Sequence, residues 1–130
     1  MLGEIQKDEL MLRAIYLKSQ RPDLDFWEDD GRPSPAAFKK KDGISVDRTA
    51  NRTIEEAVQY IRGHKEGAIV SITVLDCLAA EIYIDYCPNN HNPYHCVLCQ
   101  SKTELKLSPS QARKLSRVAR IEYMPMISFA

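Results

Sequence analysis

Metal-binding residue types are concentrated in one short stretch of the chain. Cys87, His91, His95, Cys96 and Cys99 bring five thiol and imidazole groups into 13 positions. Zinc takes four nitrogen or sulfur ligands at tetrahedral corners, and Cys96 and Cys99 have the spacing of half a site. Against this, a strand through that pair would point its two thiols to opposite faces. We therefore favour no cofactor, and a zinc-stabilised binding module with ligands Cys87, His91, Cys96 and Cys99 is the minor alternative.

A second group of residues could act on a phosphorylated ligand such as a nucleotide or nucleic acid. His95 follows the turn-forming Asn92-Pro93-Tyr94, which places an imidazole, able to act as acid or base near pH 7, at the rim of a sheet. Asp47 could orient His95 if their strands are neighbours, and Arg48 with Arg13 could hold a phosphate or carboxylate. The alternative is a histidine that hydrogen-bonds loop backbone and a surface Asp-Arg pair.

Trp27 is the chain's one tryptophan, and it lies in a loop over residues 19–33 that is rich in Pro, Gly and Asp. Long ordered loops usually carry their own hydrophobic anchor, so a side chain pinned to the core is the favoured interpretation. The alternative is an aromatic group at a partner-binding surface.

A basic stripe is expected near the end of the chain. Arg113, Arg117 and Arg120 fall at positions i, i+4 and i+7 of a predicted helix, with Lys114 beside them. Such a stripe could follow nucleic-acid phosphates, although a solvated helix face is the favoured interpretation. The formal net charge of zero argues against a surface wholly devoted to nucleic acid.

The elements that must position these residues follow from hydrophobic periodicity and cap signals. Thr53 with Glu56, and Ser108 with Gln111, have the spacing of capping boxes at helix starts. Strands are predicted over residues 10–17, 43–48, 68–74, 81–86, 94–99 and 103–107, and helical segments over 34–38, 54–62, 75–80 and 108–120. The sum is an α+β domain over 1–130: a mixed or mostly antiparallel sheet with two main helices and its helices covering one side. Residues 1–9 and 121–130 are expected at its periphery.

Composition narrows the class of protein. The apolar fraction of 44% and the charged fraction of 28% are those of an ordinary soluble domain. No apolar run approaches the roughly 20 residues of a membrane span, and the mixed, charged start is not that of a signal peptide. We expect a cytoplasmic protein with reduced cysteines and no membrane partner.

Several of these pieces together resemble a loose family of short bacterial proteins. They are Arg13, the run Pro33-Ser34-Pro35-Ala36-Ala37-Phe38, Ser45-Val46-Asp47-Arg48, and Asn92-Pro93-Tyr94-His95, within roughly residues 10 to 120. The resemblance implies a bacterial gene context of the mobile or defence-associated kind and no particular reaction. Its pattern lacks the cysteines, so it favours Arg13, Asp47, Arg48 and His95 as a shared site over a metal.

No complete catalytic motif accompanies these residues, because the chain has neither a Gly-x-Ser-x-Gly elbow nor a glycine-rich phosphate loop. Our leading hypothesis is therefore a small interaction component of a bacterial multi-protein system, docking a protein partner through the Trp27 loop, the tail or the rim around His95. The first alternative is an enzyme that uses His95 with Arg13 and Arg48, and the second is the zinc module.

Overall fold

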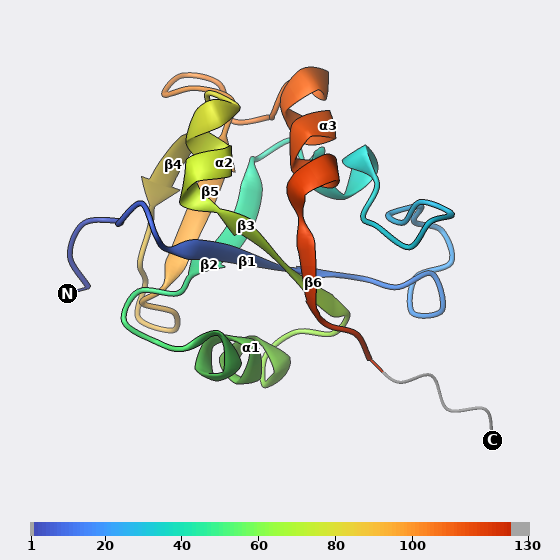
Figure 1. The fold of residues 1–130 in the computed structure, drawn as a ribbon, viewed down its shortest axis with the longest axis horizontal. Coiled ribbons are helices and arrows are strands. Elements are labelled where there is room, and N and C mark those ends of the chain that lie inside the picture. Colours follow the sequence, from blue (N-terminus) through green and yellow to red (C-terminus); the bar gives the residue numbers. More distant parts are fainter. Residues whose placement is uncertain (1, 126–130) are drawn as a thin grey trace.

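Six strands form one antiparallel sheet in the order β4-β5-β2-β1-β3-β6 (Figure 1). The structure is a computed structural model, and it describes residues 2–125. The strands are β1 (Leu10–Ile15), β2 (Ile44–Arg48), β3 (Ala68–Thr73), β4 (Tyr83–Tyr86), β5 (His95–Cys99) and β6 (Arg120–Tyr123). The α+β class predicted from the sequence is confirmed.

The helices lie on both faces of the sheet, so the expectation that they cover one side is wrong. They are the 3₁₀ helix η1 (Pro35–Phe38), α1 (Ile54–Arg62), α2 (Val74–Ala79) and α3 (Pro109–Val118). Figure 1 shows α1 on one side of the sheet and α2 and α3 on the other. The strands are apolar on both faces, and that pattern calls for a cover on each side.

Alternation along β1 divides the core in two. Met11 and Ile15 belong to a larger apolar cluster that includes residues of η1, α2 and α3, whereas Leu12 belongs to a smaller cluster with residues of α1. The larger cluster also contains Val46 of β2, so Arg48 leaves the sheet on that same face. Ser45 and Asp47 leave it on the face that α1 covers in part.

Local cap chemistry sets the helix starts as predicted. Thr53 and Glu56 form a complete capping box at α1, and Ser108 and Gln111 form one at α3, where Pro109 occupies the first turn. Each box satisfies two backbone groups that a helix start leaves unpaired, which explains why these signals were readable from sequence alone.

The strand predicted over residues 103–107 is wrong. The Ser101 hydroxyl accepts hydrogen bonds from the backbone N–H groups of Thr103 and Glu104, which turns the chain where a strand was expected. Leu105 is 51% exposed, whereas Leu107 enters the larger core. The segment is therefore a turn leading into α3.

Both ends of the described chain are built into the fold. Glu9 is buried at the start of β1, and residues 120–123 form the edge strand β6 beside β3. β6 is the outermost strand of the sheet, and residues 126–130 of the predicted tail lie outside the described residues. Among residues 2–125, no helix has both the length and the apolar character to span a bilayer.

Candidate functional site

The sheet is split between its two central strands. β1 pairs with β3 along all of its six residues, but its register with β2 covers only Met11 opposite Arg48 and Leu12 opposite Asp47. Beyond that point β2 continues to pair with β5, down to Ile44. A gap therefore opens between β1 and the first half of β2.

Arg13 fills this gap. Its Nε donates to the carbonyl of Ala37 in η1 at 3.1 Å, and its Nη1 donates to the carbonyl of Ser45 in β2 at 3.0 Å. The guanidinium thus supplies the donor that a neighbouring strand would provide to Ser45 in an unbroken sheet. Its Nη2 donates to no described residue and is free for a ligand.

Arg13 carries its charge without an acidic partner. None of the ion pairs among residues 2–125 includes it. Burial lowers the pKa of Arg13 to about 10, so the guanidinium stays charged at neutral pH. Burying an ion uncompensated by a counter-charge is costly, which makes this position unusual for a purely structural arginine.

A cavity of about 620 Å³ opens on Arg13. Lys39, Lys40, Lys65 and Arg21 also line it, and Glu66 is the acid among its lining residues. One wall is apolar, formed by Ile15, Leu24 and Phe26. The volume lies within the range of small-molecule sites, which are mostly apolar with a few convergent polar groups.

The cations around this cavity differ in how far they are already neutralised. Arg21 pairs with Asp23 at 3.1 Å, with its Cζ 5.5 Å from the centre of the Tyr16 ring. Lys39, Lys40 and Lys65 are absent from the ion pairs of the described residues. The cavity therefore has a net positive lining, with Arg13 deepest and lysines at the exposed rim.

Arg48 is not available to a ligand. Its Nε and Nη2 donate to the two carboxylate oxygens of Glu9 at 2.9 and 2.8 Å, and Nη1 and Nη2 donate to the carbonyls of Gly3 and Glu4. The Arg48 and Glu9 side chains are 1% and 4% exposed. Tyr86 stacks on the guanidinium at 4.8 Å. Arg48 holds the N-terminal segment to the sheet, and it shares no pocket with Arg13.

His95 and Asp47 lie opposite each other on neighbouring strands, β5 and β2. The carboxylate nevertheless accepts from Asn92 Nδ2 at 2.9 Å, and no hydrogen bond joins it to the imidazole among the described contacts. His95 Nδ1 instead lies 3.3 Å from the carbonyl oxygen of Cys87, and Nε2 lies 3.4 Å from Ser45 Oγ. The four predicted site residues therefore divide between the two faces of the sheet: Asp47 and His95 leave one face, and Arg13 and Arg48 leave the other.

The contacts of His95 assign its tautomer. A carbonyl oxygen can only accept, so Nδ1 carries the proton and Nε2 is left as an acceptor for the Ser45 hydroxyl. A hydroxyl that donates to an oriented imidazole is the arrangement of a nucleophile and its base, at distances that are often looser without substrate. Ser45 lines the cavity of Arg13, and His95 is not among its lining residues.

A smaller cavity of about 150 Å³ lies between α1 and the sheet. It shares Ala14, Ser45, His64 and Lys65 with the larger cavity, so the two abut at the split. The residues it does not share are Leu12, Val46, Asp47, Tyr60, Ile61, His91 and Asn92.

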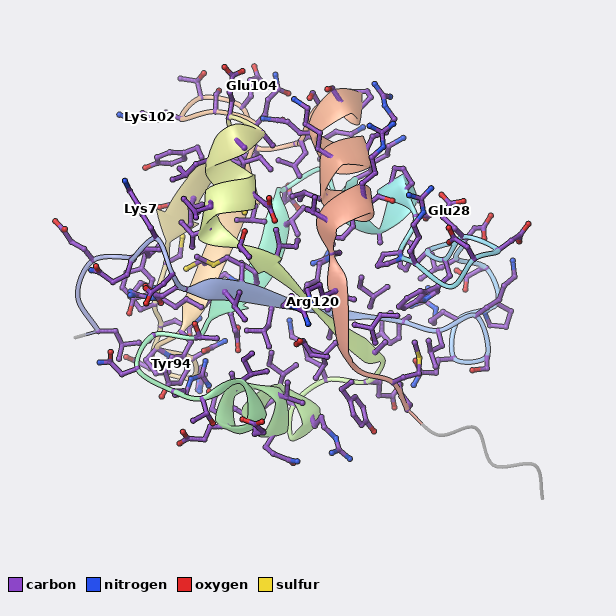
Figure 2. All side chains as sticks on the ribbon, in the orientation of Figure 1. Lys7, Glu28, Tyr94, Lys102, Glu104 and Arg120 are labelled. Atoms are coloured by element: carbon purple, nitrogen blue, oxygen red, sulfur yellow. The ribbon has the colours of Figure 1, made fainter. Side chains whose placement is uncertain are left out.

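An aromatic cluster that the sequence did not reveal holds the loop over this smaller cavity. Arg52 stacks on Tyr94 with its Cζ 3.3 Å from the ring centre, and Tyr60 meets Tyr94 edge-on at 5.5 Å. Figure 2 places Tyr94 beside the segment that enters α1. The Tyr60 hydroxyl donates to the carbonyl of His91 at 2.8 Å. Arg52 Nη1 is buried without a hydrogen-bond partner in the described structure.

The cysteines do not converge on a metal. Cys96 and Cys99 leave β5 on opposite faces, and both are buried. Burial raises the pKa of Cys96 to about 12 and that of Cys87 to about 11, so both thiols stay protonated at neutral pH. Within residues 2–125, no set of His, Cys, Asp and Glu side chains is grouped to hold a metal ion.

Trp27 anchors its loop from within. Its Nε1 donates to the carbonyl of Tyr16 at 2.9 Å, it forms an isolated bridge with Pro33, and it packs against the larger core. This is the favoured interpretation of its sequence position. The structure therefore gives Trp27 a contact within the chain, and partner binding by it has no independent support.

The basic stripe is interrupted. Arg113, Lys114 and Arg117 are exposed on α3, but the helix ends at Val118, and Arg120 belongs to β6 (Figure 2). The continuous i, i+4, i+7 stripe is therefore wrong at its last member.

Three of the residues that line the charged cavity were missed as site residues. Lys39 and Lys40 belong to a lysine run that sequence reasoning assigned to a solvated helix end, and Lys65 follows α1 without a motif of its own. The lysine run was the signal in the sequence, but which side of the molecule it occupies depends on how η1 packs.

Comparisons of the chain with family models, curated proteins and solved structures find no match.

Proposed function

We propose that the protein binds a small phosphorylated ligand in the cavity at the split of the sheet. The observation that supports this most is the partly buried guanidinium of Arg13, which has a free Nη2 and no acidic partner among the described residues. A phosphate would supply the missing negative charge and accept a charge-assisted hydrogen bond.

The rim strengthens this proposal. Lys39, Lys40 and Lys65 place three further positive charges around the same opening, with Glu66 as the opposing charge in the lining. A concave site lined by one sign of charge raises the local concentration of ligands of the opposite sign. A ligand with a single diffuse charge would leave most of this lining unused.

Binding can be tested with inorganic phosphate and pyrophosphate as probes, by thermal unfolding and isothermal titration calorimetry. We expect both anions to raise the unfolding temperature, because a ligand that binds only the folded state stabilises it. The double variant Lys39→Ala/Lys40→Ala should weaken binding by about tenfold, the equivalent of roughly 1.4 kcal/mol. Lys41→Ala is the matched control, because Lys41 is exposed in the same run and does not line the cavity.

Equal weakening by the Lys41 control would show attraction to general surface charge and contradict the proposal. Absence of any stabilisation by either anion in the intact chain would also contradict it.

The same site also has two residues, Ser45 and His95, that could catalyse a reaction of the bound ligand. Ser45 faces the cavity, and His95 Nε2 is positioned to take its hydroxyl proton. We propose that bound phosphate esters are hydrolysed in two steps. The Ser45 oxygen attacks phosphorus while His95 Nε2 takes its proton; the ester P–O bond breaks and the alcohol leaves with that proton. Water then attacks the phosphoserine with His95 again as base, which releases phosphate and restores the serine. If His95→Ala and Ser45→Ala hydrolyse a chromogenic phosphate ester at the rate of the unmodified protein, this extension fails while the binding proposal stands.

A role as an interaction component is the second candidate function, favoured by α2. Leu75 and Leu78 lie three positions apart on this helix and are 55% and 50% exposed. Residues at that spacing share a helix face. Co-purification with tagged neighbour-gene products should succeed for the unmodified protein and fail for Leu75→Asp/Leu78→Asp; retention of the same partner by that variant would contradict it.

A further inference from the structure

The two cavities adjoin at the split of the sheet, where four residues line both of them. Ala14 and Ser45 lie on the strands that border the split, and His64 and Lys65 follow α1; all four line both cavities. We take a ligand held at Arg13 to reach past Ser45 into the smaller cavity. The chemistry of the smaller cavity then limits what the far end of that ligand can be.

Asp47 is the carboxylate among the residues that line the smaller cavity, where Lys65, shared with the larger cavity, supplies a positive charge. Asp47 Oδ1 accepts from Asn92 Nδ2, and its Oδ2 accepts from no described residue. An oxygen that lacked a partner and was also fully buried would be a buried unsatisfied atom. Among residues 2–125 that description fits Arg52 Nη1 and not Asp47 Oδ2, so Oδ2 is accessible to solvent or a ligand. An ionised carboxylate only accepts hydrogen bonds, and it repels a phosphate.

The remaining polar groups of the smaller cavity are mostly committed within the protein. The Tyr60 hydroxyl donates to His91, His64 Nδ1 contacts the carbonyl of Tyr60, and Ser45 Oγ contacts His95. The free Asp47 oxygen is therefore the acceptor in best position to select a ligand, and what it selects is a hydrogen-bond donor. Lys65, which both cavities share, is already assigned to the phosphate.

The volume of the smaller cavity limits which part of a ligand can enter it. The smaller cavity measures about 150 Å³, several times the roughly 30 Å³ that one water occupies in the liquid. It has room for a hydroxyl-bearing carbon frame of a few atoms.

We infer that the ligand is a sugar phosphate: its phosphate binds at Arg13 and its hydroxyl groups reach through the split to donate to Asp47. This inference rests on the proposed phosphate binding and adds the class of compound that carries the phosphate. It assigns Asp47 to recognition of the uncharged end of the ligand.

The test compares ribose 5-phosphate with inorganic phosphate by titration calorimetry, in the unmodified chain and in Asp47→Asn. Asparagine keeps one oxygen to accept from Asn92 and replaces the free oxygen by an amide that cannot accept. We expect ribose 5-phosphate to bind about 10- to 100-fold more tightly than phosphate, the effect of one hydrogen bond to a charged group. Asp47→Asn should abolish that preference without weakening phosphate binding, because it removes a negative charge from the neighbourhood of the phosphate.

Asp85→Asn is the matched control, because Asp85 is a partly buried carboxylate on the sheet that lines neither cavity. It should leave the preference intact. A nucleoside monophosphate, which carries the same ribose hydroxyls, is included as the competing arm. If it binds more tightly than phosphate and keeps that advantage in Asp47→Asn, the apolar wall and not Asp47 is the selective element, which overturns the inference.

The outcomes separate the two proposals. Phosphate binding without a preference for ribose 5-phosphate, or a preference that survives Asp47→Asn, overturns the inference and leaves the proposed function standing. No binding of either probe overturns both.

Discussion

Arg13 and Arg48 leave the same face of the same sheet, yet their surroundings are opposite. Arg48 is enclosed by Glu9, by two backbone carbonyls and by the Tyr86 ring, so its charge and its donors are satisfied within the chain. Arg13 has two carbonyls, a free Nη2 and a cavity. This difference indicates that an arginine inside the fold marks a binding site only when the chain itself does not supply its counter-charge.

The largest effect is expected from removing the acid of the closed pair. Glu9→Gln leaves the Arg48 guanidinium buried without a counter-charge, which should lower the free energy of unfolding by about 3–5 kcal/mol. Urea denaturation measures this. Glu4→Gln is the control, because Glu4 is exposed and contributes only its backbone carbonyl to Arg48; equal losses in the two variants would contradict our account of the pair.

A smaller loss of stability, with a distinct ligand response, is expected at the open arginine. Arg13→Met removes hydrogen bonds to Ala37 and Ser45 but also removes an uncompensated charge, so we expect a loss of about 1–2 kcal/mol. Phosphate should stabilise the unmodified chain and not this variant. Unfolding measured with and without phosphate tests both parts, and full phosphate stabilisation of Arg13→Met would break the comparison.

Protonation should weaken the closed pair gradually. Burial alone would raise the pKa of Glu9, but hydrogen bonds from Arg48 and from the backbone of Gln6 and Ala50 outweigh it and hold that pKa below its ordinary value. The pair therefore contributes its stability above the pKa of an unfolded glutamate, about 4.3, and loses it as the pH falls through the folded value. Unfolding free energies measured from pH 7 to pH 3 should fall more steeply in the unmodified chain than in Glu9→Gln.

The smallest effect concerns the ring over Arg48. Tyr86→Leu and Tyr86→Phe both lose the hydrogen bond from the hydroxyl to the Pro93 carbonyl, but only the leucine variant loses the aromatic face. We expect the leucine variant to be less stable than the phenylalanine variant by about 1 kcal/mol. Equal stabilities in chemical denaturation would show that the ring contributes by packing alone.

The sequence made the local parts of this structure readable. Thr53 and Ser108 begin helices because each hydroxyl bonds a backbone N–H three residues along, an interaction confined to one turn. Ser101 shows the same chemistry where it was missed, and its turn replaced the predicted strand. β1 and β2 were predicted because each carries a continuous apolar or alternating pattern.

The sequence did not show which charged side chains would pair with each other. Glu9 and Arg48 are 39 residues apart, and nothing in the sequence distinguishes Arg48 from Arg13. Asp47 and His95 were correctly considered as cross-strand neighbours, but Asn92 and the Cys87 carbonyl take the hydrogen bonds that were expected between them. Which face a helix covers, and where a ladder stops, depends on pairing across the whole sheet.

The short register between β1 and β2 divides the sheet mechanically as well as chemically. The halves β4-β5-β2 and β1-β3-β6 are joined in register by Met11 with Arg48 and Leu12 with Asp47, directly beside the ion pair of Glu9. A ligand that bridges the open end would join the two halves where the strand ladder does not. Amide hydrogens of Arg13 to Ile15 and of Ile44 to Val46 would then exchange more slowly when the cavity is filled, while those at the positions paired between β1 and β2 would not change.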